Sequence, residues 1–339
     1  MAGHFALLGH RVALYARDLT RLGDLPQHRT VRLLEAVEGE GRLALIGDSL
    51  PDVLRDADLV MVTTTADAHR GLAMELAPLL VPGQRVVLNP GRTLGAFEFM
   101  RVLEAHGRSD VRVGEAQSLL YACRAEAPGR VRVIGVKDRV LFAACPSRHT
   151  DELLEVLNAV HPSFVRAPHV LATGLENIGA ILHPPVILFN AAAIERGAMF
   201  HFYQDMTPAV AGFIEALDAE RVAIGAAFGL NVRPLREWVA YAYSGVRGDT
   251  LLERMRDNPA YHRILAPDTL RSRLLLEDVP TGIVPMVGLA EVAGVRTPLM
   301  DAVWRMTEGL LGEDLGRHGR TLKNLGLEGI GPSELLDQL

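Results

Sequence analysis

Short apolar runs that alternate with longer amphipathic stretches restrict the fold of this chain more than any other feature of its sequence. The apolar runs lie at residues 12–15, 43–46, 57–65, 85–89, 111–114, 131–136 and 140–144. Apolar residues at helical spacing occupy intervening stretches, such as 68–80 and 94–106. Apolar strands separated by helical stretches of about 10–15 residues are typical of a parallel sheet that is covered on both faces. The first half therefore predicts a doubly wound α/β domain.

The second half of the chain has a different pattern. From about His169 onward, apolar residues recur at helical spacing. The clearest stretches are 209–229, 234–243, 286–292 and 298–311. A local break near Pro162–Pro168 separates the halves, and no low-complexity linker joins them. We predict an α/β domain at 1–165 and an all-helical domain at 166–339.

Composition excludes several classes of partner. The chain has 35 basic and 41 acidic side chains, a net charge of −6, which provides no cationic surface for nucleic acid or an anionic membrane. Cys123 and Cys145 form neither a disulfide framework nor a CxxC metal motif, which fits a reducing cytoplasm. The apolar segment 178–194 is interrupted by a histidine, two prolines and an asparagine, so no membrane span is expected. We expect a cytoplasmic protein that binds no metal, nucleic acid or membrane.

Small or polar residues follow several predicted strands, where parallel sheets bind their ligands. Ala16 and Arg17 follow the first run, Thr64 and Thr65 end a later one, and Asn89-Pro90-Gly91 closes the next. An arginine after such a strand suits the 2′-phosphate of NADP, whereas an acidic residue suits NAD. These residues predict a dinucleotide site that prefers NADP and also accepts NAD.

The same residues have simpler explanations. Arg17 can be a solvated side chain beside an Asp18 that caps the next helix, and Asn89–Gly91 can be an ordinary turn. The GxGxxG fingerprint of dinucleotide sites is also absent from its expected place. Gly39 and Gly41 lack the required strand and helix, and the glycines of 326–331 lie at the far end of the chain.

Three residues of the helical half could carry chemistry. His183 lies on a strongly apolar helix, where a histidine is more often a satisfied core residue than a catalytic one. Arg273 and Asp278 flank three leucines and could merely solvate a helix. Together, however, a histidine, an aspartate and an arginine are the groups needed for proton transfer and carboxylate binding.

Seven stretches, in order along the chain, resemble the octopine/nopaline (opine) dehydrogenase family. They are residues 88–98, 114–124, 181–184, 218–224, 258–261, 277–285 and 319–327. The resemblance implies a Rossmann domain followed by the helical dehydrogenase domain of that family. It also implies that NAD(P)H reduces the imine formed between a 2-oxo acid and the amino group of an amino acid. By the same resemblance, His183 is the acid/base, Asp278 orients its imidazole and Arg273 binds a substrate carboxylate. Glu115 either faces the substrate or has a structural role.

The chain departs from the family pattern at its start. It opens with a helix tail, Gly9 and a strand, so the first strand and the Gly-rich loop are expected to be missing and Met1 to be internal to the first helix. A catalytically inactive relic or binding protein is therefore one alternative. A reductase of the ketopantoate or glycerol-3-phosphate type is another, but the helix around His183 offers no lysine donor. We predict an opine dehydrogenase whose partners are small molecules, and a homodimer is compatible with the sequence.

Overall fold

The computed structural model describes residues 1–243 and 245–339, which form two compact units. The first, here called the sheet unit, comprises Met1–Thr64, Ala68–Gly91 and Phe99–Val170. The second, the helical unit, comprises Thr65–Asp67, Arg92–Glu98 and Leu171–Leu339. Two short stretches from the first part of the chain thus belong to the helical unit.

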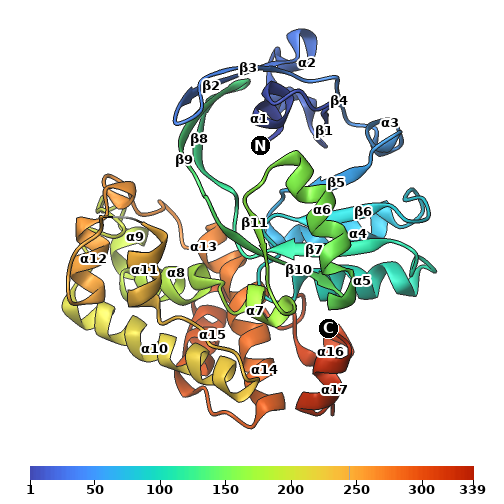
Figure 1. Cartoon of the computed structure of the whole chain (residues 1–339). Coiled ribbons are helices and arrows are strands. Elements are labelled where there is room, and N and C mark those ends of the chain that lie inside the picture. The colour runs from blue at the N-terminus through green and yellow to red at the C-terminus, as the bar shows by residue number, and fades with distance from the viewer. Residues whose placement is uncertain (244) are drawn as a thin grey trace. The chain divides into compact units, whose positions relative to one another are not determined.

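Seven strands of the sheet unit form two sheets in which most neighbours are parallel (Figure 1). They are β1 (Ala13–Tyr15), β4 (Leu45–Gly47), β5 (Leu59–Val62), β6 (Arg85–Leu88), β7 (Arg112–Ala116), β10 (Val140–Cys145) and β11 (Phe164–Arg166). β1 pairs with β4, and the other five have the order β11-β10-β7-β6-β5. β10 runs antiparallel to β7, and all other pairs are parallel. The predicted Rossmann-like arrangement is confirmed, but as two sheets with one antiparallel pair.

The larger sheet is covered on both faces. Val86, Val87 and Leu88 are consecutive residues of β6, and all three are fully buried. Because successive side chains of a strand point to opposite faces, both faces of the sheet must be packed. The helices of the first half are α1 (Ala2–Leu7), α2 (Leu25–His28), α3 (Leu50–Leu54), α4 (His69–Leu76), α5 (Gly95–Ala105) and α6 (Thr150–Val160).

A further four-stranded sheet was not predicted. Its strands are β2 (Thr30–Glu35), β3 (Gly39–Arg42), β8 (Tyr121–Ala127) and β9 (Arg130–Val136), in the order β3-β2-β9-β8. Gly39 and Gly41 belong to β3, so the strand accounts for these glycines and no nucleotide-binding loop is needed to explain them. A Cβ atom at Gly41 would overlap the carbonyl group of Gly3 in α1, so this close packing of helix on strand requires glycine.

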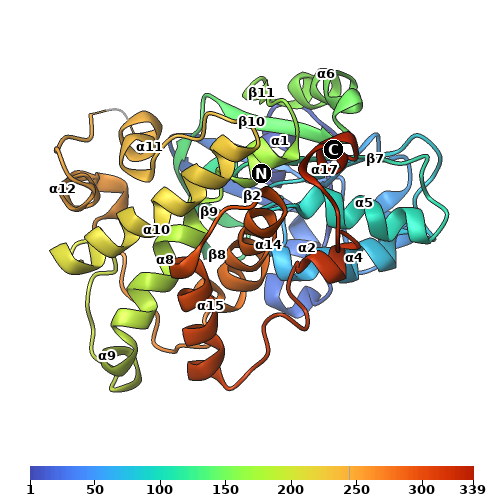
Figure 2. The same ribbon diagram turned by 90° about the horizontal axis from the view of Figure 1, so that it is seen from below.

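The second half is helical, as predicted. Its helices are α7 (Val170–Gly174), α8 (Ile178–Phe189), α9 (Ala191–Glu195), α10 (Pro208–Ala227), α11 (Leu235–Ala242), α12 (Leu251–Asp257), α13 (Arg273–Leu276), α14 (Val284–Ala293), α15 (Pro298–Leu311), α16 (Leu322–Leu325) and α17 (Pro332–Asp337). α8 packs against α10, α13 and α15, and Figure 2 shows α8, α10 and α15 close together. Residues 170–189 are long and apolar enough to cross a membrane, but 72% of this segment is buried inside the protein. It is a core segment of the helical unit.

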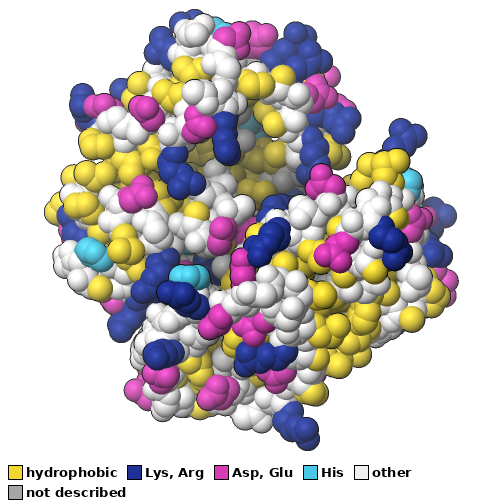
Figure 3. Space-filling model, turned by 180° about the vertical axis from the view of Figure 1, so that it is seen from behind, with side chains coloured by type: hydrophobic (Ala, Val, Ile, Leu, Met, Phe, Trp, Pro, Cys, Tyr) yellow, Lys and Arg dark blue, Asp and Glu magenta, His cyan; other side chains and the backbone are white. Residues whose placement is uncertain are grey.

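Charged side chains are spread over the face of the molecule that Figure 3 shows. Figure 3 shows basic and acidic side chains interspersed on one face, with apolar patches between them. This distribution agrees with the small net charge of −6.

Candidate active site

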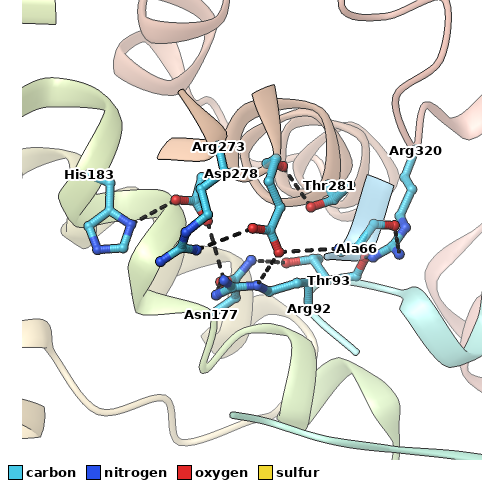
Figure 4. Close-up of polar contacts among 10 residues, drawn as sticks. Ala66, Arg92, Thr93, Asn177, His183, Arg273, Asp278, Thr281 and Arg320 are labelled. Carbon is cyan, nitrogen blue, oxygen red and sulfur yellow. Dashed lines mark hydrogen bonds and ion pairs between the residues drawn. The ribbon is translucent and has the colours of Figure 1, made fainter. Parts of the chain in front are cut away.

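His183 and Asp278 meet in the helical unit although they lie 95 positions apart in the chain. α8 carries His183, whose side chain is 15% exposed, and Asp278 is fully buried. Nδ1 of His183 lies 2.7 Å from Oδ2 of Asp278 (Figure 4). Burial by itself raises the pKa of Asp278, but His183 and Arg92 outweigh it and hold that pKa below its ordinary value. Asp278 is therefore a carboxylate that can only accept, and Nδ1 carries the shared hydrogen.

The other ring nitrogen of His183 remains for chemistry. Because Asp278 occupies Nδ1, only Nε2 can exchange a proton with a ligand. Nε2 lies 3.2 Å from the hydroxyl of Tyr203, in the segment between α9 and α10. The site thus has a histidine with one committed and one exchangeable nitrogen.

Glu277, which precedes Asp278 in the chain, contacts an exposed arginine, Arg273. The side chain of Glu277 is only 4% exposed and accepts a hydrogen bond from the backbone N–H of Ala66 at 3.2 Å. It also accepts from Nη1 of Arg273 at 3.3 Å. The side chain of Arg273 nevertheless stays 58% exposed. Glu277 therefore tethers a guanidinium group that solvent, and hence a ligand, can reach.

Arg92 lies between the two carboxylates. Its Nε donates to Oε1 of Glu277 at 3.2 Å, its Nη2 lies 3.8 Å from Oδ1 of Asp278, and its Nη1 donates to Asn177 at 3.1 Å (Figure 4). Burial by itself lowers the pKa of Arg92, but Asp278 and Glu277 outweigh it and raise that pKa above its ordinary value. Arg92 therefore compensates two buried negative charges and holds Asp278 in the charged form.

Glu277 and Asp278 lie directly before an irregular helical turn. Asp278 directly precedes a π-helical turn, η5 (Val279–Ile283), which joins α13 to α14. The hydroxyl of Thr281 donates to the carbonyl of Glu277 at 2.7 Å, and the N–H of Thr93 donates to the carbonyl of Thr281 at 3.3 Å. Wide π turns are frequent at functional sites because they redirect side chains within a helix.

The residues proposed to contact the nucleotide lie at strand ends. All belong to the sheet unit except Thr65, which directly follows Thr64 and is assigned to the helical unit. Thr64 and Thr65 follow β5 and are exposed. Ala16 is half-buried and Arg17 is exposed directly after β1. Asp18 accepts a hydrogen bond from the N–H of Thr20 and caps the next short helix, as its simpler explanation predicts. These strand ends offer hydroxyl and cationic groups that fit the ribose and phosphates of a dinucleotide.

The turn at Asn89–Gly91 is packed inside the protein. Asn89 is fully buried, and its amide bonds the backbone of Ser118 and Leu120, both at 3.3 Å. Glu115 is also fully buried, and a Cβ atom at Gly91 would overlap its carboxylate, so position 91 requires glycine. Pro90, between Asn89 and Gly91 in the chain, is buried as well. In this structure the side chain of Asn89 bonds another protein segment and that of Glu115 packs against Gly91, and their ligand contacts stay predictions.

His183, Asp278 and Arg273 were singled out from the sequence, whereas Arg92, Glu277 and Tyr203, which contact them in the structure, were assigned no role. Arg92 directly follows the Asn-Pro-Gly turn, and Glu277 precedes Asp278, so both stood next to residues already singled out. Tyr203 had no such neighbour. Within residues 1–243 and 245–339, no group of three or more His, Cys, Asp or Glu side chains could hold a metal ion.

Comparison with known proteins decides the family. The model of the NAD/NADP octopine/nopaline dehydrogenase alpha-helical domain matches residues 166–311. The opine dehydrogenase of Arthrobacter sp. (strain 1C) is 37% identical, over 97% of this chain and 92% of that protein. The chain belongs to the octopine/nopaline dehydrogenase family. Vitopine synthase of Allorhizobium ampelinum is 29% identical over 91% of this chain and 88% of that protein. The chain is thus an opine dehydrogenase, an NAD(P)-dependent oxidoreductase that acts on CH–NH groups.

Solved structures show the same fold. Octopine dehydrogenase with NADH and L-arginine has a TM-score of 0.81 at 21% identity, covering 99% of this chain and 94% of that one. NADP+-bound yersinopine dehydrogenase has a TM-score of 0.72 at 18% identity, covering 98% and 93%. A ketopantoate reductase-like structure from Ralstonia solanacearum reaches 0.59 at 19% identity, over 91% and 94%. The reductase alternative thus shares the fold, but the sequence relationship is to opine dehydrogenases.

Proposed function

We propose that this opine dehydrogenase reduces the C=N bond of an imine formed from a 2-oxo acid and the amino group of an amino acid. The observation that carries the proposal is the 2.7 Å contact between His183 and the buried carboxylate of Asp278. Beside it, the exposed guanidinium of Arg273 is held by Glu277. A proton-exchanging group and a carboxylate-binding group are what this reaction asks of the protein.

His183 exchanges the proton. In its protonated form, Nδ1–H donates to Asp278 and Nε2–H is the available acid. Asp278 accepts this hydrogen bond at 2.7 Å from a fully buried position, which fixes the orientation of the ring. After the proton leaves, the same contact keeps the hydrogen of the neutral ring on Nδ1, so that Nε2 can accept a proton in the reverse direction. When bound, NAD(P)H supplies the hydride that reduces the imine carbon.

Arg273 orients the substrate. A guanidinium group donates two parallel hydrogen bonds to a carboxylate, which fixes both its position and its plane. Both an amino acid and a 2-oxo acid carry such a carboxylate. Glu277 restrains Arg273 from the buried side at 3.3 Å. We assign Arg273 to a substrate carboxylate and Glu277 to the positioning of Arg273.

The direct test is turnover by the purified protein. Supplied with NADPH, a 2-oxo acid such as pyruvate and a panel of amino acids, the protein should oxidise NADPH only when both substrates are present. Mass spectrometry should then detect the secondary-amine dicarboxylate. Absence of turnover with every pair would refute the proposed reaction, and turnover with the 2-oxo acid alone would favour the ketopantoate-type alternative.

We further propose that NADPH is preferred and NADH also accepted. The proposal is supported by Arg17, which is exposed and follows β1, where an arginine suits the 2′-phosphate of NADPH. Arg17→Ala is expected to raise the KM for NADPH about tenfold, because a charge-assisted contact to the 2′-phosphate is lost. The KM for NADH should change less than twofold. Arg11→Ala is the matched control, since Arg11 is also exposed but precedes the same strand. Steady-state kinetics with both cofactors measure the effect, and a wild-type preference for NADH would contradict it.

A further inference from the structure

The nitrogen of His183 that exchanges the proton is already hydrogen-bonded within the protein. Nε2 lies 3.2 Å from the hydroxyl of Tyr203. A neutral imidazole nitrogen has one lone pair in the plane of the ring, and it directs that lone pair at one partner. A substrate atom therefore cannot form a straight hydrogen bond with Nε2 while Tyr203 holds this place. Either Tyr203 moves away or it takes part in the transfer.

The packing around Tyr203 opposes its movement. Tyr203 is only 7% exposed, and its ring stacks on Tyr261 with a centroid distance of 4.2 Å and an angle of 21°. The rings of Phe202 and Tyr203 form a T-shaped pair with a centroid distance of 4.9 Å, and Phe202 forms another with His183 at 5.8 Å. Swinging the phenol away would break the stack and expose buried aromatic surface. The hydroxyl is therefore a fixed neighbour of Nε2.

We propose that Tyr203 is a catalytic residue that relays the proton between His183 and the substrate nitrogen, an inference that rests on the proposed function. A phenol hydroxyl donates and accepts at the same time. During reduction, the Tyr203 O–H gives its proton to the imine nitrogen while the Tyr203 oxygen takes the proton of Nε2–H. The C=N π bond breaks as N–H and C–H bonds form, and the cofactor that supplies the hydride is oxidised. His183 ends neutral and Tyr203 ends unchanged.

The relay predicts a specific loss when only the hydroxyl is removed. Tyr203→Phe keeps the ring that stacks on Tyr261 but removes the hydroxyl that relays the proton. We therefore expect kcat to fall about 10²-fold, the scale of general acid–base catalysis. KM for the cofactor and the melting temperature should stay near the wild-type values. Tyr243→Phe is the matched control because Tyr243 meets Tyr261 at 5.3 Å in the same aromatic cluster, and it should retain kcat within twofold. Tyr203→Phe with kcat within threefold of wild type, or above it, would overturn the relay.

A second measurement separates a relay from a merely structural role. Two protons move in one step in the relay. A plot of the wild-type rate against the deuterium fraction of H₂O/D₂O mixtures should therefore be curved. For Tyr203→Phe the dependence should become a straight line. A straight line for the wild type would refute the relay while leaving imine reduction intact. Absence of turnover by the wild type with every substrate pair would instead refute the proposed function itself.

Discussion

Replacement of His183 by alanine is expected to lower kcat for imine reduction by about 10³-fold, within the range that a positioned acid–base group contributes. The variant loses the ring that contacts both Asp278 and Tyr203. Cofactor affinity should be retained, since the proposed nucleotide contacts Ala16, Arg17 and Thr64 lie in the sheet unit. Stopped-flow measurement of NADPH oxidation gives kcat, and fluorescence titration gives the dissociation constant of the cofactor.

His201→Ala is the control for that experiment. His201 belongs to the same unit, but its side chain is 44% exposed and lies 3.6 Å from Asp205. Its replacement should leave kcat within twofold of wild type. If His183→Ala also kept kcat within tenfold of wild type, then His183 would be a core histidine and another group would have to exchange the proton.

Replacement of Arg92 by methionine should destabilise the protein by about 3–5 kcal/mol, the usual result of removing one partner from a buried ion pair. Glu277 is 4% exposed and Asp278 is fully buried, so neither carboxylate can recover the lost interaction from water. Chemical denaturation followed by circular dichroism measures the free energy of unfolding. Arg101→Met should cost less than about 1 kcal/mol, because the Arg101–Glu104 pair is partly exposed at both ends.

The pH dependence of the Arg92→Met effect provides an independent check. In the wild type the pKa of Asp278 is lowered, so its contribution to stability is present above the unfolded-state pKa and is lost as the pH falls through the folded-state pKa. In the variant, the burial that raises the pKa of Asp278 is no longer offset by Arg92, and protonation of Asp278 in acid removes its uncompensated charge. The deficit relative to wild type should therefore be larger at pH 8 than at pH 5. A deficit that does not change with pH would show that lost packing, rather than charge, causes it.

The parts of the fold that rest on local patterns could be predicted from the sequence. Apolar runs and helical spacing located most of the strands of the parallel sheets and most long helices, because burial on both faces leaves a continuous apolar signal. β2 and β11, which also pair in parallel, were missed. β8 was missed because most of its residues are exposed or half-buried, which leaves no such signal. The antiparallel direction of β10 relative to β7 was missed for another reason. Strand direction follows from pairing between distant segments and not from the residues of either strand.

In the candidate site, too, some residues could be predicted from the sequence and others could not. His183 and Asp278 were singled out because a histidine, an aspartate and an arginine together can transfer a proton and bind a carboxylate, and because the family resemblance connected them. Arg92 did not stand out because an arginine after a turn is ordinary, and its partner Glu277 lies 185 positions away. Tyr203 offered no signal at all. Its importance comes from the 3.2 Å contact with Nε2, which only the tertiary structure creates.

The π-helical turn after Asp278 also bears on how this site could arise or vanish. Such a turn contains one residue more than the regular helix would need, so deletion of one residue from Val279–Ile283 would restore α-helical geometry. That deletion would turn Arg273, Glu277 and Asp278 by about 100° relative to α14, since each residue advances an α-helix by that angle. The helices could remain while the carboxylates lost His183 and Arg92. A single codon gained or lost at this place could therefore separate an enzyme from an inert protein of the same architecture.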